Sequence, residues 1–278
     1  MYFEFTFQVS DPETQEIIIA ELSSLPFEGF MENADSLSAY LAANDYTVEI
    51  ADCLEQIVWN YNCQILKNSI EEQNWNAAWE SSYPAVFIDD FCAIYADFHT
   101  IPKGSKYPVR INPRMSFGTG HHATTELVIR QMKSINFQGA QVFDFGSGTG
   151  ILSLLASLMG AKKVYGLDNE FWAYENAVEN RNLNGLTEDH IIFSHGVIEV
   201  LPEELSFDHI LANINRHVLL DHAEILYNKL KSGGIFICSG ILRDDEEIIR
   251  SVYSAKGFVH INTIQKENWI SIAFQKTN

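Results

Sequence analysis

The stretch Val142-Phe-Asp144-Phe-Gly146-Ser-Gly148-Thr-Gly150-Ile-Leu152 joins a hydrophobic strand, a glycine-rich turn and the start of a helix. Glycines let a turn adopt backbone angles that other residues avoid, and they let a ligand approach the backbone closely. A strand that runs into such a turn before a helix is typical of nucleotide-binding α/β domains. The stretch therefore predicts an α/β fold and a ligand site within it.

The spacing of the glycines distinguishes between ligands. Dinucleotide-binding turns have the pattern G-x-G-x-x-G, whose third glycine lets the helix pack closely beneath a pyrophosphate. Here the pattern is G-x-G-x-G, and isoleucine occupies position 151. With no pyrophosphate to hold, Gly146 and Gly148 can admit the amino-acid part of a ligand, and Asp144 can accept a hydrogen bond from its ammonium, directly or through water. We interpret the turn as a site for S-adenosylmethionine.

Strands and helices alternate around this turn. We expect strands at residues 141–145, 163–167, 191–194, 207–212, 234–239, 258–265 and 269–275, and helices at 122–135, 150–159, 170–182, 218–229 and 244–255. This alternation predicts a parallel sheet, but only Lys266-Glu-Asn268 separates the last two strands, which requires an antiparallel pair. A parallel sheet that ends in an antiparallel hairpin is typical of methyltransferases. We therefore predict an α/β fold of the Rossmann-like, seven-stranded class I methyltransferase type.

Two polar residues end strands of this predicted sheet. Asp168 lies 22 residues after Gly146, where an acid can accept hydrogen bonds from both ribose hydroxyls; it can also cap the helix that begins near Glu170. Asn213 ends the fourth strand, and ligands of open α/β sheets lie at the carboxyl ends of strands. Its side-chain carbonyl can orient an attacking amine, so we predict that Asn213 has a catalytic role.

The residues after Asn213 argue against a flat acceptor. Adenine and glutamine methyltransferases follow this asparagine with Pro-Pro and an aromatic residue, whereas Ile214 and Asn215 stand here. A base or a side-chain amide is therefore not the expected acceptor.

A segment rich in glycines and hydroxyls precedes the first strand of the sheet. It contains Phe117 and Gly118 in a loop and Thr124 and Thr125 at the start of a helix, and the backbone amides of a helix start favour a carboxylate. We expect these four residues to bind the methionine end of the cofactor. His121 and His122 are adjacent, but no second cluster of ligands has matching spacing, so we predict no metal site.

The first part of the chain has a different pattern. Strands at residues 2–9, 27–31, 37–41 and 64–71 and helices at 11–25 and 48–60 follow the order βαββαβ, which predicts a small ferredoxin-like α+β domain. We assign residues 1–72 to this domain, 73–90 to a linker with a short helix at 73–83, and 91–278 to the methyltransferase domain.

The charge of the chain is concentrated in this first part. Residues 1–90 contain 17 Asp or Glu and one basic residue, Lys67, a net charge of −16 out of −19 for the whole chain. Such a surface repels nucleic-acid phosphates and attracts a cationic protein, so we expect no direct binding of nucleic acid. An acidic surface that only maintains solubility is an equally open interpretation.

The remaining features favour a cytoplasmic protein. The four cysteines are scattered without a C-x-x-C pair, so neither a disulfide framework nor a zinc site is predicted, and buried inert thiols are expected. An acid stands near the amino terminus where a signal peptide has Lys or Arg, and no membrane-spanning segment is visible. We expect a cytoplasmic monomer that does not bind membranes.

Taken together, these segments resemble the PrmA-type lysine methyltransferases of ribosomal protein L11. The resemblance covers nearly the whole chain and rests on Phe27-Glu-Gly-Phe30, Trp75, Trp79, Pro84, Phe117-Gly-Thr-Gly-His121 with Thr124-Thr125, the glycine turn, Gly160-Ala-Lys-Lys-Val164, Asn180-Arg-Asn-Leu-Asn-Gly185, Ala212-Asn-Ile214 and Ser239-Gly-Ile-Leu242. Ser147, Ala123 and Asn215 depart from the usual cysteine, proline and leucine, and Asn215 stands nearest the acceptor. The resemblance implies that Thr125, Gly146, Asp168 and Asn213 bind the cofactor.

The resemblance also implies a substrate. The small domain of the family recognises the lysine-rich ribosomal protein, which gives the acidic first part a partner. No residue is evident as a general base, with His121 and His122 the weak candidates. Two other functions stay open: methylation of another protein or of a small molecule on the same scaffold, and cofactor binding without catalysis in ribosome assembly.

Overall fold

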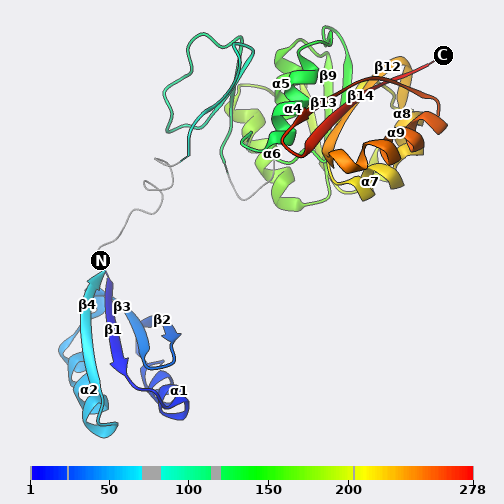
Figure 1. The fold of residues 1–278 in the computed structure, drawn as a ribbon. Helices are drawn as coiled ribbons and strands as arrows, with labels where there is room; N and C mark the ends of the chain where they lie inside the picture. Colours follow the sequence, from blue (N-terminus) through cyan, green and yellow to red (C-terminus); the bar gives the residue numbers. More distant parts are fainter. Residues whose placement is uncertain (1, 24, 71–82, 114–119, 203, 278) are drawn as a thin grey trace. The chain divides into compact units, whose positions relative to one another are not determined.

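The structure is a computed structural model that describes residues 2–23, 25–70, 83–113, 120–202 and 204–277 (Figure 1). The chain forms two compact units, Met1–Tyr83 and Pro84–Asn278. Their boundary falls within the range 73–90 that the sequence assigned to a linker. The short helix predicted at 73–83 falls almost wholly on residues 71–82, which lie outside the described part.

The first unit is a four-stranded antiparallel sheet with two helices. Its elements are β1 (Tyr2–Gln8), α1 (Pro12–Leu22), β2 (Phe27–Glu32), β3 (Leu37–Ala42), the 3-10 turn η1 (Ala43–Asp45), α2 (Val48–Asn60) and β4 (Gln64–Ile70). The strands lie in the order β2-β3-β1-β4. Helix α1 begins where expected, because the Asp11 carboxylate accepts a hydrogen bond from the Thr14 amide at 3.0 Å and Pro12 follows. The ferredoxin-like prediction is confirmed.

Alternation along β1 explains which sheet face the helices cover. Phe5 and Phe7 are buried and belong to one hydrophobic cluster with side chains from both helices, among them Ile18 and Leu54. Because alternate residues of a strand point to one face, α1 and α2 pack on the same side of the sheet. Glu4 and Thr6 belong to the opposite face, where Glu4 accepts a hydrogen bond from the Tyr40 hydroxyl at 3.1 Å.

The second unit begins with a small three-stranded sheet. It consists of β5 (Val86–Ile88), β6 (Cys92–Tyr95) and β7 (Tyr107–Arg110). Strand β6 pairs antiparallel with β5 and parallel with β7. Helix α4 (Ala123–Met132) then precedes the main sheet.

The main sheet has seven strands. It contains β8 (Gln141–Phe145), β9 (Lys163–Asp168), β10 (Ile191–His195), β11 (Phe207–Asn213), β12 (Leu230–Leu242), β13 (Phe258–Lys266) and β14 (Trp269–Lys276), in the order β10-β9-β8-β11-β12-β14-β13. The first five strands in this order pair in parallel, and β14 pairs antiparallel with both β12 and β13. This confirms the Rossmann-like sheet with a terminal antiparallel hairpin.

Helices cover both faces of this sheet (Figure 1). One hydrophobic cluster joins the sheet to α4, α5 (Ile151–Leu158) and α6 (Phe171–Leu183). A second cluster joins it to α7 (Arg216–Asp221), α8 (Ala223–Lys229) and α9 (Glu246–Ala255). The 3-10 turns η2 (Ile198–Val200) and η3 (Arg243–Asp245) lie in connections. The carboxyl ends of the parallel strands therefore form one edge between two helical layers.

Two elements differ from the sequence expectation. The helix predicted at 218–229 is two helices, because His222 has non-helical angles (φ −104°, ψ 8°) and its Nδ1 donates to the Val218 carbonyl at 2.8 Å. The strand predicted at 234–239 extends over all of β12, whose pairing with β11 shifts register after Phe207. A register shift of this kind leaves no periodic signal in one sequence.

Three further observations concern the described residues. None of their helices is long and apolar enough to cross a membrane, and they contain no cluster of three or more His, Cys, Asp or Glu arranged to hold a metal ion. The four cysteines are free. Burial raises the pKa of Cys92 and Cys238 to about 12, which makes these thiols inert at neutral pH, whereas Cys53 and Cys63 are only half-buried.

Candidate cofactor site

The glycine turn after β8 has backbone angles that explain its spacing. Gly146, Gly148 and Gly150 all have positive φ, at 76°, 54° and 80°. A Cβ on Gly146 would lie 2.2 Å from Ile214 Cγ2, and one on Gly150 would lie 2.7 Å from Phe193 Cζ. The first glycine therefore admits the segment after β11, and the third lets α5 start close to β10.

Asp168 ties this turn to the end of β9. Its carboxylate is 8% exposed and accepts hydrogen bonds from the amide of Gly148 at 2.7 Å and from that of Glu170 at 3.0 Å. A carboxylate has about four lone-pair sites, so two backbone contacts leave capacity for ligand hydroxyls. Asp168 thus stabilises the start of α6, one of its two predicted roles, and can still bind a ribose.

A cavity of about 230 Å³ opens beside Asp168. Gly146 and Asn169 also line it, together with Phe145, Leu167, Gly196, Val197, Ile198, Ile214, Asn215, Val218 and His222. Its walls are largely apolar, and the polar groups are few. The flat faces of a purine base fit such walls, and the Asp168 carboxylate can act as an acceptor for a ribose attached to that base.

Asp144 lies behind the turn rather than in this cavity. It is fully buried, and its Oδ2 accepts hydrogen bonds from the amide and the hydroxyl of Ser153 at 3.0 and 2.7 Å. Its Oδ1 has no hydrogen-bond partner among the described residues. Burial raises the pKa of this carboxyl to about 7, against the lowering effect of the Ser153 hydrogen bonds. Of the two predicted routes to a ligand ammonium, this placement favours the one through water.

Thr125 and Asn213 meet at the end of β11. Asn213 Nδ2 donates to Thr125 Oγ1 at 3.3 Å, across 88 residues of sequence. Asn213 Oδ1 is buried and has no partner among the described residues. The threonine hydroxyl therefore fixes the amide so that its carbonyl oxygen stays available as an acceptor.

Thr124 and the two histidines are engaged by local structure. His122 caps α4: its Nδ1 lies 2.7 Å from Thr124 Oγ1 and accepts from the Thr124 amide at 3.3 Å. His121 Nε2 lies 2.9 Å from the Pro84 carbonyl, to which it donates. Both imidazoles have structural partners, which weakens the idea that either is a general base. Phe117 and Gly118 lie outside the described residues.

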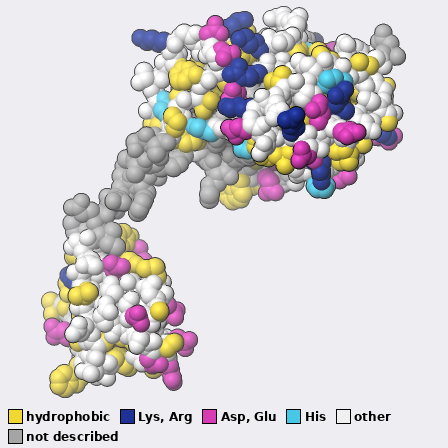
Figure 2. All heavy atoms as spheres, viewed as in Figure 1, with side chains coloured by type: hydrophobic (Ala, Val, Ile, Leu, Met, Phe, Trp, Pro, Cys, Tyr) yellow, Lys and Arg dark blue, Asp and Glu magenta, His cyan; other side chains and the backbone are white. Residues whose placement is uncertain are grey.

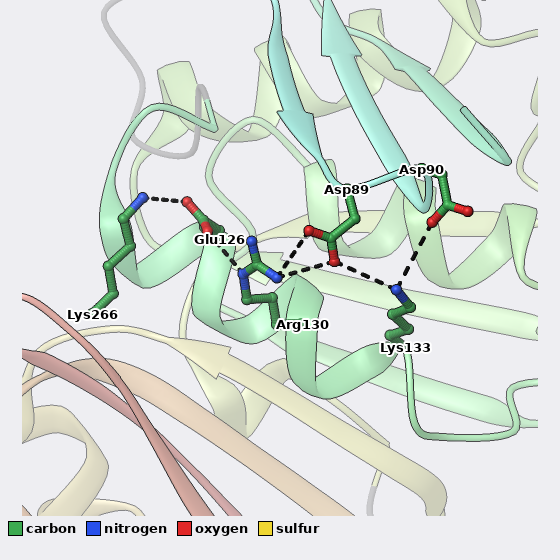
Figure 3. Close-up of polar contacts among 6 residues, drawn as sticks. All are labelled: Asp89, Asp90, Glu126, Arg130, Lys133 and Lys266. Atoms are coloured by element: carbon green, nitrogen blue, oxygen red, sulfur yellow. Dashed lines mark hydrogen bonds and ion pairs between the residues drawn. The ribbon is translucent and has the colours of Figure 1, made fainter. Parts of the chain in front are cut away.

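An ion-pair network holds α4, which presents Thr125 (Figure 3). Glu126 pairs with Arg130 at 2.8 Å and with Lys266 of the β13–β14 hairpin. Arg130 and Lys133 both reach Asp89 in the β5–β6 turn, at 3.1 and 3.4 Å. Exposed pairs contribute little individually, but together they link α4 to two separate elements, the β5–β6 turn and the β13–β14 hairpin.

The Asn180-Arg-Asn-Leu-Asn-Gly185 segment, which the sequence left without a role, also has a structural explanation. Asn176 and Asn180 of α6, and Asn184 directly after it, are spaced one helical turn apart and hydrogen-bond the backbone of residues 110–112. The contacts are Asn184 Oδ1 with Arg110 N (3.0 Å), Asn184 Nδ2 with Arg110 O (2.6 Å), Asn180 Oδ1 with Asn112 N (2.7 Å) and Asn176 Nδ2 with Asn112 O (3.1 Å). Asn180 Nδ2 also donates to the Thr149 carbonyl at 2.9 Å. This asparagine ladder connects the glycine turn to the segment that leads towards α4.

Apart from Gly146 and Asp168, the residues of the cavity wall were not predicted as site residues from the sequence. Gly196, Val197 and Ile198 follow β10, and applying the rule for carboxyl ends to β10 as well as β11 would have identified them. Val218 and His222 had no comparable signal. Asn215, which the resemblance placed near the acceptor, caps α7 by accepting from the Val218 amide at 3.1 Å.

A comparison with known protein families identifies the fold's relatives. The model of the family "Ribosomal protein L11 methyltransferase (PrmA)" matches residues 6–277. The chain belongs to this PrmA family. This confirms the resemblance found in the sequence.

Individual relatives agree with this assignment. The ribosomal protein L11 methyltransferase of Bacteroides fragilis is 33% identical over 98% of this chain and 99% of its own length. That of Porphyromonas gingivalis is 33% identical over 93% of this chain and 90% of its own length. The crystal structure of ribosomal protein L11 methylase from Lactobacillus delbrueckii subsp. bulgaricus has a TM-score of 0.64 and 27% identity, covering 70% of this chain and 100% of that one.

The site fits S-adenosylmethionine, the cofactor of the PrmA family. The cavity can take the adenine, Asp168 the ribose, and the backbone of the glycine turn the amino-acid part. Among the described polar groups near these residues, Asn213 Oδ1 is buried without a partner.

Proposed function

We propose that the chain transfers methyl groups from S-adenosylmethionine to the ε-amino groups of lysines, and to the N-terminal amino group, of ribosomal protein L11. The observation that carries the choice of an amine is Asn213. Its amide is held by Thr125, and its Oδ1 is buried without a partner among the described residues. A buried carbonyl gains most from a donor that completes its hydrogen bonding, and an amine N–H is such a donor.

The cofactor and the residues of the site have separate roles in the proposed reaction. S-adenosylmethionine supplies an electrophilic methyl group. Asp168 and the glycine turn hold the cofactor, and Asn213 Oδ1 accepts one N–H of the amine so that the nitrogen lone pair is directed at the donor. An exposed lysine has a pKa of about 10.4, and transfer into an apolar site lowers it towards the neutral, nucleophilic form. Alignment of the two reactants then contributes most of the rate.

The test is methylation of purified ribosomal protein L11 with labelled cofactor, followed by mass spectrometry of the modified residues. We expect label on lysines and on the amino terminus. Asn213→Ala should lower kcat by a larger factor than it lowers affinity for S-adenosylhomocysteine, whereas Asn182→Ala, on the exposed side of α6, should change neither. Label in nucleic acid or metabolites would contradict the substrate, and tight cofactor binding without turnover would indicate a non-catalytic assembly factor.

We also propose that residues 1–72 bind the substrate protein and that the chain does not bind nucleic acid directly. The chain would act as a monomer in the cytoplasm, where ribosomal proteins are made. The net charge of −16 in residues 1–90 is complementary to a lysine-rich protein, and acidic side chains outnumber basic ones on the visible face of this unit (Figure 2). Salt shortens the Debye length from about 10 Å at 0.1 M to about 3 Å at 1 M. Stopped-flow association with the substrate should therefore slow with salt while cofactor affinity stays constant; a salt-independent rate would contradict this role.

A further inference from the structure

The one basic residue among residues 1–90, Lys67, lies in an unusual environment. The surrounding unit is rich in acids, yet among the described residues no carboxylate lies within ion-pairing distance of its Nζ. Lys67 instead lies over aromatic rings: Nζ is 3.5 Å from the ring centroid of Tyr46, 3.8 Å from that of Phe3 and 5.6 Å from that of Phe5. Three aromatic rings around one ammonium form a cation site, which we call the aromatic cage.

The fold itself places these side chains together. Phe3 and Phe5 are alternate residues of β1, and Lys67 of β4 is the direct cross-strand partner of Phe5. All three therefore lie on the helix-covered face of the sheet. Tyr46, just before α2, stacks on Phe5 with ring centroids 5.6 Å apart and meets Phe3 edge-on at 5.4 Å. Because the three rings pack against one another, their arrangement does not depend on contacts with Lys67.

The aromatic cage opens into a cavity of about 290 Å³ between α2 and β4. Besides Phe5, Tyr46 and Lys67, the cavity is lined by apolar residues of α2 and β4 and by the carboxylate-bearing Glu55. Strand β4 is an edge strand, next to β1 alone. The cavity therefore lies at an open edge of the unit and has room beside Lys67 for a second side chain.

We propose that the aromatic cage and this cavity form a second lysine-recognition site, which binds a methylated lysine side chain of the substrate protein in competition with Lys67. The inference rests on the proposed function, since that reaction creates methylated lysines. Methylation keeps the positive charge but removes N–H groups that bind water, so aromatic faces compete better for a methylated ammonium than for Lys67. The site would retain a substrate that already has one modified lysine while another is presented to the catalytic unit.

The experiment uses the full chain and three peptides that differ at one position: trimethyllysine, lysine and glutamine. In the wild type, Lys67 competes, and binding of the trimethyllysine peptide should be weak. Lys67→Gln removes the competitor and should tighten binding of that peptide about tenfold, within the range of a desolvated cation–π contact. The lysine peptide should bind less tightly and the glutamine peptide least. Isothermal titration calorimetry measures all three.

A matched pair of tyrosines tests the cage itself. Adding Tyr46→Leu to Lys67→Gln should abolish the gain, because it removes the ring nearest the ammonium. Adding Tyr40→Leu should preserve the gain, because Tyr40 lies on the opposite sheet face and bonds Glu4. Circular dichroism establishes that each variant is folded. Equal affinity of Lys67→Gln for the three peptides, or equal loss with both tyrosine changes, would overturn the proposal.

Methyl transfer to ribosomal protein L11 is measured on the same proteins. Peptide binding without any transfer would overturn the proposed function and leave the cation site standing. Transfer without selective binding of the trimethyllysine peptide to Lys67→Gln would overturn the cation site alone.

Discussion

Removing the Asp168 carboxylate tests the cofactor site most directly. If this side chain accepts the ribose hydroxyls, Asp168→Ala loses charged hydrogen bonds worth about 1.5–3 kcal/mol. That corresponds to an affinity loss of about 10- to 150-fold for S-adenosylhomocysteine. The same change also frees the amides of Gly148 and Glu170, which Asp168 now satisfies at 2.7 and 3.0 Å. A simple loss of affinity could therefore come from a disturbed turn.

A thermodynamic cycle separates the two causes. S-adenosylhomocysteine and its 2′-deoxyribose counterpart are titrated by calorimetry into the wild type and Asp168→Ala. The wild type should prefer the intact ribose, and the variant should bind both ligands almost equally, because the group that distinguishes them is gone. Asp208→Ala is the matched control: Asp208 also accepts from a backbone amide, that of Gln141 at 2.8 Å, but at the amino end of β11.

A loss of affinity for both ligands by the same factor in Asp168→Ala would contradict this role of the carboxylate. The carboxylate would then act only through the glycine turn and the start of α6, and the ribose would lie elsewhere. Asp208→Ala should lower the melting temperature without changing the preference between the ligands.

Three other changes have distinct expected results. Asp144→Asn should raise the melting temperature at pH 8 but not at pH 4. The folded pKa of about 7 lies above the usual 3.8, so the stability of the wild type falls as the pH rises between these values. A difference in melting temperature that stays constant across pH would contradict this explanation. Asn180→Ala removes the hydrogen bonds to the Asn112 amide and the Thr149 carbonyl and should lower the free energy of unfolding by about 2–4 kcal/mol in urea, against almost no effect for exposed Asn182→Ala. His222→Phe should reduce the preference for S-adenosylhomocysteine over its inosine counterpart, because Nδ1 donates to the Val218 carbonyl and Nε2 is left to accept from an amine of the base. An unchanged preference would exclude this contact.

The periodicity of hydrophobic residues, together with the turn residues between the segments, was sufficient to predict most of the fold. Each strand of the main sheet has a hydrophobic pattern bounded by polar or glycine residues, and only three residues, Lys266 to Asn268, separate the last two expected strands. That spacing permitted only a hairpin, and β13 and β14 form one. Conversely, the break in the helix at His222 depends on a single side-chain hydrogen bond. The length of β12 depends on a register shift in its pairing with β11. Neither has a repeated pattern that a window of sequence could reveal.

The residues of the site were likewise only partly predictable from the sequence. Gly146 and Asp168 were identifiable because a turn and a strand end constrain which residue types can stand there. The sequence could not show that Asp144 faces Ser153 of α5, because strand alternation gives the face of the sheet but not the partner on it. The asparagine ladder was likewise hidden, since its i, i+4 spacing on α6 is visible but its target, the backbone near residue 112, is not.

If the chain transfers methyl groups to lysine as proposed, the arrangement at Asn213 also explains why the reaction needs no evident base. His121 and His122 have structural partners, and the one strongly perturbed carboxyl near the turn, Asp144, is enclosed behind it. Bulk water can take a proton from an exposed lysine before the side chain enters the site. What the protein must then do is keep the neutral amine oriented, and the fixed carbonyl of Asn213 has the required polarity. A base would be needed only if the amine arrived protonated, and an apolar site disfavours that form.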